Sequence, residues 1–306
     1  MARLAPRKLT RVFTLVLTAR FAHLANAAHA RRGHACGRGY YRGPMSAGFS
    51  IMSWNVNSVR ARLDNVLAYL DEHQPDVACL QETKVADSLF PRVPFMELGY
   101  RIALNGTKGY AGVATLTKDR EPEAVQRGFA EAPADKHSRI LACTYAGVRI
   151  YNLYVPNGTA VGTEAFAYKL AWLERLRLEL GQSFAPSDPL VVCGDFNIAR
   201  DARDVVSVEA LVGHTHFTPE EHAALDGLEG VGLRDCFRKH DQEPGRFTWF
   251  DYRDGSWERK QGMRIDYVYA SAPMYERCTG VVHDWEPREW DTPSDHVPVT
   301  ATFAAG

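Results

Sequence analysis

The 306-residue sequence lacks any apolar run long enough to cross a membrane, so a membrane-spanning helix is not expected. It also lacks the CxxC spacing typical of zinc sites and redox motifs, although it contains six cysteines. Several of these lie in apolar, strand-like segments such as DVACL and LVVC, which predicts reduced thiols in a core rather than a disulfide framework. The six are Cys36, Cys79, Cys143, Cys193, Cys236 and Cys278.

Acidic residues are absent from the first 50 positions, which hold nine of the 36 Lys and Arg residues. The rest of the chain therefore carries 27 basic and 37 acidic residues, a net charge of −10, although the whole chain has a formal charge of −1. An overall field of that sign repels phosphate. If the folded part binds nucleic acid, it must do so through a local basic rim.

Residues 1–48 form an Arg- and Ala-rich segment with one short apolar stretch, VFTLVLTA. Three interpretations compete: a secretory signal, an organellar transit peptide, or an upstream extension of a chain that starts at Met45 or Met52. The free-thiol pattern argues against secretion. We expect a basic extension that is disordered or an artefact of the assigned start. We also expect a cytoplasmic, nucleoid-associated protein, with an organellar address as the alternative.

From residue 49 onward, strand-like and helix-like segments alternate without a linker, which predicts a single domain over residues 49–306. Apolar residues recur at helical spacing after Leu63 and from about Thr163 to Gly181, and TPEE at residues 218–221 has a helix-capping signature. Many strand-like segments alternate apolar and polar residues, which favours mixed or antiparallel sheets packed face to face with helices outside. Expected strands include IMSWNV, DVACLQ, VRIYNLYV, LVVCGD, RFTWF, MRIDYVYA and VPVTATF.

Polar side chains stand where several of these apolar strands end. In LVVCGDFN, Asp195 and Asn197 would share one face of the extended chain while Phe196 packs on the other. An Asx turn, in which both side chains only bond nearby backbone, is the alternative for this stretch alone. Because the pattern recurs, it predicts one site assembled at a shared sheet edge. The other strand ends carry Asn55 and Asn57, Glu82 and Lys84, Tyr154 and Asn157, Asp266, and Asp295 with His296.

Asp266 lies among Ile265, Tyr267 and Val268, in what we expect to be the interior of a strand. A carboxylate buried there without a donor would cost roughly several kcal/mol or become neutral, so a partner is required. His296 is the natural candidate, because a hydrogen bond to Asp266 would fix the tautomer and raise the pKa of the imidazole. The alternative is a core histidine unrelated to a surface aspartate.

Seven ordered motifs resemble those of the exonuclease III and AP endonuclease family: SWNVNSVRA, PDVACLQETK, YNLYVPNG, VVCGDFNI, RFTWFDYR, MRIDYVYA and PSDHVPV. The resemblance covers about residues 50–304 and is specific because all seven appear in family order. It implies the four-layered α/β sandwich of DNase I, with two packed mixed β-sheets flanked by helices. It also implies Mg²⁺-dependent hydrolysis of DNA phosphodiesters in base-excision repair, by an exodeoxyribonuclease III-type 3′–5′ exonuclease with or without AP endonuclease activity.

By this resemblance, Glu82 corresponds to the main metal ligand, with Asn55 beside it and Asp295 near the same ion. The expected cofactor is Mg²⁺, with Mn²⁺ as a substitute. The residue types support a cation independently, because carboxylates clustered at Glu82, Asp195 and Asp295 would repel one another without a divalent ion.

The resemblance also implies how the reaction is divided among side chains. Asp195 matches the residue that orients and deprotonates the attacking water, and Asn197 and Tyr154 match phosphate contacts. His296, oriented by Asp266, would contact the scissile phosphate and offset the charge that grows in the transition state.

Substrate binding is expected at an aromatic segment and a nearby loop. Phe247 and Trp249 alternate along RFTWF and could line one apolar slot that Met263 closes. The resemblance implies that this slot receives a base-less deoxyribose, and core packing is the alternative. Asn157 matches a further phosphate-side amide. His216, in the loop GHTHFTPEE, is expected to fill space in the slot and favour 3′-end trimming over incision at abasic sites.

Two other classes compete with this assignment. DNase I-like enzymes that cleave sphingomyelin or inositol phosphates share a metal glutamate, GDxN and SDH, but QETK and RFTWFDYR point away from them. RNA-binding regulators of the same fold have lost catalytic residues that this chain keeps, such as Glu82, Asp195 and His296. The expected partner is double-stranded DNA with abasic sites or 3′ ends. We expect the protein to act as a monomer and not to bind a membrane.

Overall fold

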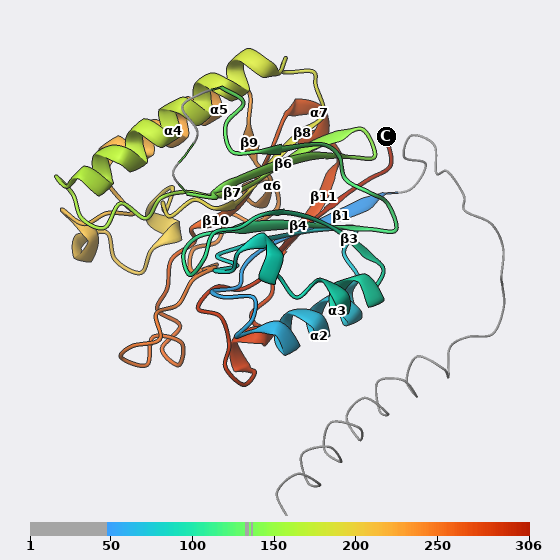
Figure 1. Cartoon of the computed structure of the whole chain (residues 1–306). Coiled ribbons are helices and arrows are strands. Elements are labelled where there is room, and N and C mark those ends of the chain that lie inside the picture. The colour runs from blue at the N-terminus through green and yellow to red at the C-terminus, as the bar shows by residue number, and fades with distance from the viewer. Residues whose placement is uncertain (1–47, 132–134, 136) are drawn as a thin grey trace, which may run out of the picture. The chain divides into compact units, whose positions relative to one another are not determined.

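The computed structural model describes residues 48–131, 135 and 137–306, so the predictions made for residues 1–47 lie outside the described part. Figure 1 shows two β-sheets packed face to face, with helices on the outer side of each. The layers therefore run helix, sheet, sheet, helix. This arrangement confirms the predicted four-layered α/β sandwich.

The first sheet has six strands in the order β11-β12-β1-β2-β4-β3. Its β1 and β2 run parallel, and its other neighbouring pairs are antiparallel, so the sheet is mixed. The strands are β1 (Phe49–Asn55), β2 (Val77–Gln81), β3 (Tyr100–Asn105), β4 (Val113–Lys118), β11 (Cys278–His283) and β12 (Val299–Phe303).

The second sheet repeats this plan with the order β5-β6-β7-β8-β10-β9. Here β7 and β8 form the parallel pair, and the remaining neighbours are antiparallel. The strands are β5 (Glu123–Arg127), β6 (Ile140–Tyr145), β7 (Val148–Tyr154), β8 (Leu190–Asp195), β9 (Arg234–Asp235) and β10 (Asp266–Ala270).

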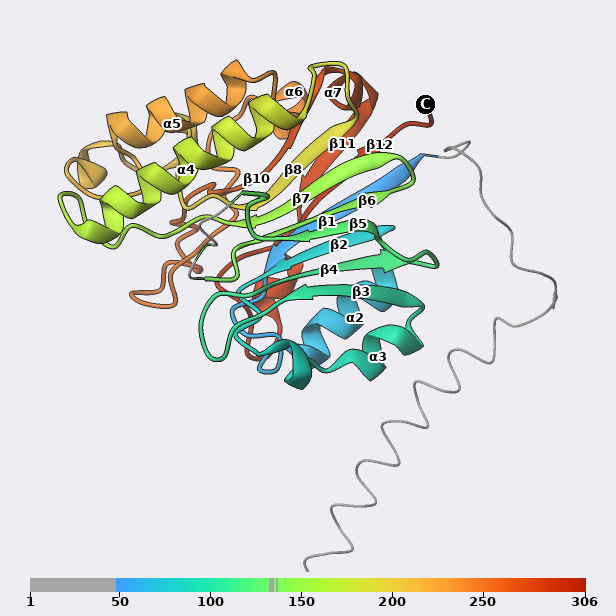
Figure 2. The same cartoon turned by 45° about the horizontal axis from the view of Figure 1, so that its top comes forward.

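Helices cover the outer faces of both sheets, as Figure 2 shows: α2 and α3 lie on the first sheet, and α4 and α5 on the second. Their bounds are α2 (Leu63–His73), α3 (Arg92–Glu97), α4 (Glu164–Ser183) and α5 (Pro219–Gly230), and α6 (Cys236–His240) and α7 (Ala272–Arg277) are shorter. The expected capping box is present, because Thr218 and Glu221 bond each other's backbone N–H at the start of α5. No helix in the described ranges is long and apolar enough to cross a membrane.

Alternating side chains on each strand build separate apolar layers. In β8, Val191 and Cys193 face the space between the sheets, whereas Leu190 and Val192 pack under α4 and α5. A third cluster fills the space between the first sheet and α2 and α3. Five of the six cysteines lie in the described part, and all five are buried free thiols, as predicted.

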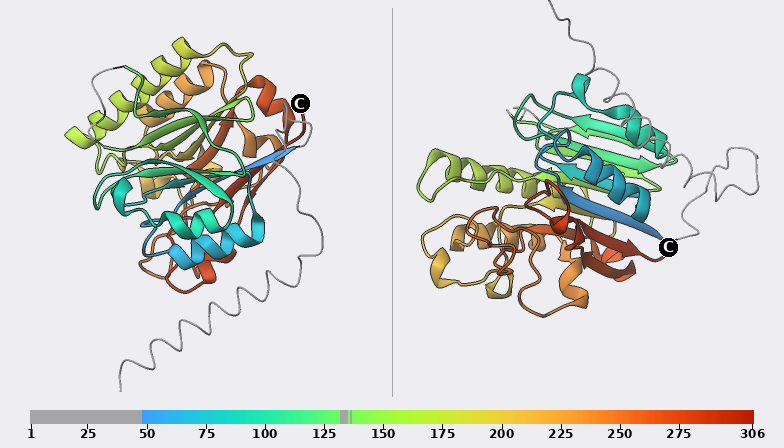
Figure 3. Two further views of the ribbon diagram at one scale, coloured as in Figure 1. Left: turned by 45° about the vertical axis from the view of Figure 1, so that its right-hand side comes forward. Right: turned by 90° about the horizontal axis from the view of Figure 1, so that it is seen from below.

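Strand direction brings the polar strand ends to one edge of the sandwich, whose two stacked sheets Figure 3 shows from two further sides. In the parallel pairs, Asn55 lies beside Gln81, and Tyr154 lies beside Asp195. β10 is antiparallel to β8, so its first residue, Asp266, is paired with Asp195. His296 precedes β12, which is antiparallel to β1, and it therefore lies at the same edge.

The expected strand at RFTWF is wrong, and Asp266 is the first residue of β10 rather than an interior one. Residues 246–250 form no strand, because their backbone groups bond two different segments instead of one neighbouring strand. Trp249 pairs with Met263 on one side and with His296 on the other. Side chains in this segment consequently do not follow strand alternation, and Phe247 packs in a separate cluster with Phe250.

Candidate active site

Asn55, the last residue of β1, is fully buried and joins two carboxylates from different sheets. Its Nδ2 lies 3.0 Å from Glu82 Oε1 and 2.9 Å from Asp195 Oδ2, so both acids accept hydrogen bonds from one amide. Asn55 Oδ1 is held in place by the backbone N–H of Asn57 at 3.0 Å. The two sheets thus meet at this amide, and it fixes the spacing between Glu82 and Asp195.

The GDFN turn needs its glycine because the backbone of β7 approaches too closely for any side chain. Gly194 has φ +144°, and a Cβ there would lie 1.9 Å from the carbonyl oxygen of Leu153. Beyond it, Asp195 Oδ1 accepts the backbone N–H of Asn197 at 2.9 Å. The Asx-type bond proposed as an alternative is therefore present, and it coexists with the contact between Asp195 and Asn55.

His296 and Asp266 form the predicted pair, with 2.9 Å between Nδ1 and Oδ2. Both side chains are buried, and the backbone carbonyl of His296 accepts a hydrogen bond from the indole of Trp54 at 3.1 Å. Burial alone would lower the pKa of the imidazole, but the carboxylates of Asp266 and Asp195 outweigh it and raise the pKa to about 10. His296 is therefore a cation at neutral pH, with Nε2 3.7 Å from Asp195 Oδ2.

Asp195 is an acid whose proton affinity suits proton transfer near neutral pH. Its burial, together with the charges of Asp266 and Glu82, raises its pKa to about 7, although His296 opposes the shift. A carboxylate with such a pKa can accept a proton from a bound water and still be ionised in a large fraction of molecules.

The raised pKa of Asp195 predicts a pH-dependent cost in stability. In the folded state Asp195 keeps its proton up to about pH 7, whereas an ordinary aspartate releases it near 3.8. The contribution of this group to the free energy of unfolding is therefore fully present below about pH 4 and is lost as the pH rises to about 7. In EDTA, Asp195→Asn should therefore raise Tm over the parent by at least about 2 °C at pH 7.5 and by less at pH 4. Calorimetry at both pH values checks this; an equal difference at the two would contradict it.

Glu82 follows β2 directly and faces Lys84, whose ammonium lies 2.6 Å from Oε2. Burial would raise the pKa of Glu82, but Lys84 and the amide of Asn55 outweigh it and hold the pKa below the ordinary range. Asn57 links this group to Asp295, since its Nδ2 lies 3.0 Å from Asp295 Oδ1. Glu82 is thus ionised, and its side chain is partly exposed to solvent, at 16%.

Tyr154 ends β7, and its hydroxyl lies beside the carboxylate of Glu82. Burial and the nearby carboxylates of Glu82 and Asp195 raise the pKa of its hydroxyl well above the ordinary range, so it stays protonated and can donate. The guanidinium of Arg139 lies 4.8 Å from its ring centroid. Asn157 Nδ2 donates to Asn197 Oδ1 at 3.1 Å.

The structure brings together only part of the predicted sugar slot. Trp249 and Met263 pack in one apolar cluster, and the indole N–H of Trp249 donates to Asp295 Oδ2 at 3.1 Å. Phe247 does not join them, because the segment is not a strand and Phe247 is buried in another cluster. The ring of His216 lies beside Asn157, with 3.4 Å between His216 Nε2 and Asn157 Nδ2.

Two groups of donors could hold a metal ion. Ligand atoms of Asp195, Asp266 and His296 lie within 4.8 Å of one another, which was not expected for a metal site. However, two of these ligand atoms, His296 Nδ1 and Asp266 Oδ2, already bond each other at 2.9 Å. The oxygens of Glu82 and Asp195 meet at one Asn55 amide and remain hard anionic donors, so this side fits a divalent cation better.

Sequence reasoning did not assign roles to several residues that contact this site. Lys84 stands in the QETK motif and could have been recognised as a partner of Glu82. Thr248 Oγ1 accepts the backbone N–H of Asp266 at 3.0 Å, and its place between two aromatic residues gives no sign of this contact. Lys169 and Glu221 lie 52 positions apart and gave no local motif.

A sandwich with two acids, a carboxylate-bound imidazolium and tyrosine and asparagine donors at one edge defines a metal-assisted phosphoester hydrolase. A family model, Endonuclease/Exonuclease/phosphatase family, matches residues 52–296, and the chain belongs to that family.

Three similar proteins refine this result. Exodeoxyribonuclease III of Haemophilus influenzae is 35% identical over 265 residues, covering 83% of this chain and 99% of the relative. An AP endonuclease structure from Archaeoglobus fulgidus is 37% identical with a TM-score of 0.79, covering 83% of this chain and 99% of its own. A 3′ phosphatase from Neisseria, NExo, bound to a product DNA hairpin, is 35% identical with a TM-score of 0.81 and the same coverage. The predicted family and enzyme class are thereby confirmed.

Proposed function

We propose that this protein is a Mg²⁺-dependent hydrolase that cleaves phosphodiesters of double-stranded DNA at 3′ ends or abasic sites during base-excision repair. The observation that carries the proposal is that the buried amide of Asn55 joins Glu82 to Asp195, and that Asp195 in turn faces His296. The names of the relatives support DNA as the substrate. Residues 49–306 would form one catalytic domain, acting as a cytoplasmic monomer.

Asp195 would orient and deprotonate the attacking water. Its Oδ1 accepts the backbone N–H of Asn197, whereas its Oδ2 accepts the side-chain amides of Asn55 and Asn197 and faces His296. The hydrogen bond from Asn55 and the nearby charge of His296 hold this carboxylate in one orientation, which reduces the entropy lost on reaching the reactive geometry.

His296 would meet the phosphate as a cation. Attack on a phosphodiester increases negative charge on the non-bridging oxygens, and Nε2 is the ring nitrogen that Asp266 leaves free. Tyr154, Asn157 and Asn197 would donate to the same phosphate, Asn197 by exchanging its present bonds to the Val155 carbonyl and to Asp195 Oδ2. Asp266 positions the ring and keeps it charged.

The cation would be held by Glu82, with Asn55 beside it and Asp295 nearby. When bound, Mg²⁺ neutralises charge on the phosphate and on the departing sugar oxygen. Hard carboxylate oxygens suit Mg²⁺, and Mn²⁺ would substitute for it. Lys84 would keep Glu82 ionised and ready to bind.

A single assay tests the proposed function. A labelled duplex carrying one abasic site and one recessed 3′ end is incubated with the protein, with Mg²⁺ or with EDTA. Mg²⁺-dependent release of nucleotides or strand incision is the expected result, and Glu82→Gln should shift the Mg²⁺ requirement to higher concentration. No cleavage at saturating Mg²⁺, or cleavage that EDTA leaves unchanged, would contradict the proposal.

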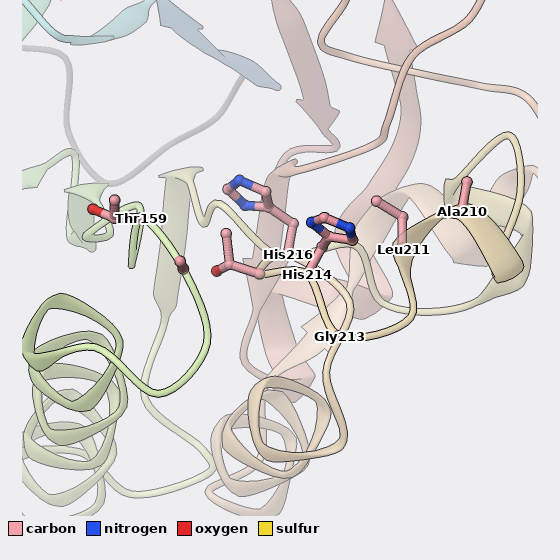
Figure 4. Close-up of a pocket in the computed structure, with 8 residues that line it drawn as sticks. Thr159, Ala210, Leu211, Gly213, His214 and His216 are labelled. Carbon is pink, nitrogen blue, oxygen red and sulfur yellow. The ribbon is translucent and has the colours of Figure 1, made fainter.

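His216 would fill part of the sugar slot. Figure 4 shows its ring beside that of His214, across a surface pocket from Thr159, and Leu211 lines this pocket and also packs near Trp249. Burial and the Lys169 ammonium lower the pKa of His216 to about 4, so the ring is neutral and acts by its bulk.

His216→Gly should raise the ratio of the abasic-site incision rate to the 3′ exonuclease rate by at least about tenfold. An effect of this size is expected when a side chain that fills a substrate pocket is removed. Glycine also accepts the φ of +83° that His216 adopts, so the variant should fold. Relative kcat/KM on the duplex described above measures the effect. The matched control is His214→Gly, at an exposed position of the same loop; equal ratios in all three proteins would remove the role assigned to His216.

A further inference from the structure

A fully buried ion pair lies behind the site, outside the groups that would touch the phosphate. Lys169 on α4 and Glu221 on α5 both have 0% side-chain exposure, and they bond each other directly. Lys169 occupies the core-facing stripe of α4 between Phe166 and Leu173, where an apolar residue would be expected. Burying two charges is costly unless further hydrogen bonds satisfy them, so their other contacts indicate their purpose.

The Lys169 ammonium binds the backbone of two phosphate-side loops at once. Its Nζ lies 2.7 Å from the carbonyl oxygen of Asn197, which follows β8, and 3.2 Å from that of Asn157, which follows β7. Gly158 allows this approach, since a Cβ there would lie 2.9 Å from Lys169 Cδ. One side chain therefore fixes the relative position of both asparagines.

Glu221 extends the same network into the loop before α5. Its Oε1 accepts the backbone N–H of His216 at 3.0 Å and lies 2.9 Å from the hydroxyl of Thr215, while Oε2 accepts the N–H of Thr218 at 3.0 Å. The Lys169 ammonium outweighs burial and holds the pKa of Glu221 below its ordinary range. Glu221 is thus both a helix cap and the counter-ion of Lys169.

The backbone held by this pair is in an unfavourable conformation. Asn197 has φ +52° and His216 has φ +83°, values that non-glycine residues adopt rarely and that persist where surrounding contacts over-determine them. Lys169 contacts the carbonyl of Asn197, and Glu221 contacts the N–H of His216, so each strained residue is bound by one member of the pair.

We propose that Lys169 and Glu221 are positioning residues that hold the amides of Asn157 and Asn197 at the distance a phosphate requires. The inference rests on the phosphate-binding roles proposed above for these asparagines. Neither Lys169 nor Glu221 touches the substrate. They act by fixing two loops whose misplacement by about 1 Å would lower the rate by up to about 100-fold.

The test compares Lys169→Met, Glu221→Gln and the double variant K169M/E221Q with the parent. Each single change leaves one buried charge unpaired and should lower Tm, whereas the double variant removes both charges and should regain most of the lost Tm. If the pair positions the asparagines, kcat of the double variant stays at least about tenfold below the parent while Mg²⁺ affinity is unchanged. Lys169→Arg, which keeps the charge and the donors, should retain more kcat than Lys169→Met.

Leu176→Ala is the matched control, because Leu176 is fully buried on the same helix and packs in the outer core. It should lower Tm without lowering kcat measured below its Tm. Recovery of both Tm and kcat in the double variant would overturn the inference and leave a purely structural pair. Asp195→Asn in the parent tests the proposed mechanism separately, so the two failures can be told apart.

Discussion

Asp195→Asn is expected to lower kcat for DNA cleavage by about 10²–10⁴-fold, the range typical of losing a general base. Asparagine keeps the shape of the side chain and its contact with the backbone of Asn197, but its amide cannot accept the proton of the attacking water. Because the phosphate donors are untouched, KM should change little. Single-turnover rates at saturating Mg²⁺ measure the chemical step directly.

Asp119→Asn provides the matched control for this prediction. Asp119 is exposed and follows β4 at the sheet edge opposite the site, and its φ of +56° suits asparagine. The control should cleave DNA at the parent rate. A rate for Asp195→Asn within about threefold of the parent would mean that another group takes the proton.

His296→Asn should lower kcat by about 10²–10³-fold. This is the range typical of enzymes that lose one preorganised hydrogen-bond donor to an oxygen that becomes negatively charged in the transition state. The variant keeps a hydrogen-bonding group beside Asp266 but has no positive charge to offset that of the phosphate. The raised pKa of His296 predicts that the parent keeps this contribution until pH approaches about 10, where the imidazolium loses its proton. The fold difference between parent and variant should therefore shrink at high pH.

His73→Asn is the control for the histidine variant. His73 ends α2, just before β2 begins at the far edge of the sheet, and its side chain is 40% exposed. Its rate should match the parent at every pH. A difference between parent and His296→Asn that is constant from pH 7 to 10 would show that charge on the ring is not what stabilises the transition state.

Much of this site could be predicted from the sequence because its residues stand at the ends of apolar strands. Asn55, Tyr154 and Asp195 are all readable in this way, and the parallel pairs β1–β2 and β7–β8 bring such ends to one edge. Asp266 required a different argument, from the cost of burying a carboxylate, and that argument found His296 correctly.

The remaining features depend on contacts between distant segments. RFTWF alternates like a strand, but its backbone groups bond residues near Met263 and His296 instead of one neighbour, so Phe247 turns away from Trp249. Lys169 appears as one basic position in a helical stripe, and its partner Glu221 appears as a capping residue. Only the packing of α4 beside α5 shows that they form a pair.

The central claim is that Glu82 and His296 face one cation and one phosphate. Anomalous scattering from Mn²⁺ in crystals of the protein with a DNA duplex would locate the ion directly. The ion should lie within ligation distance of a Glu82 carboxylate oxygen, with the scissile phosphate between it and His296. An ion bound solely by Asp195, Asp266 and His296, away from Glu82, would contradict the account.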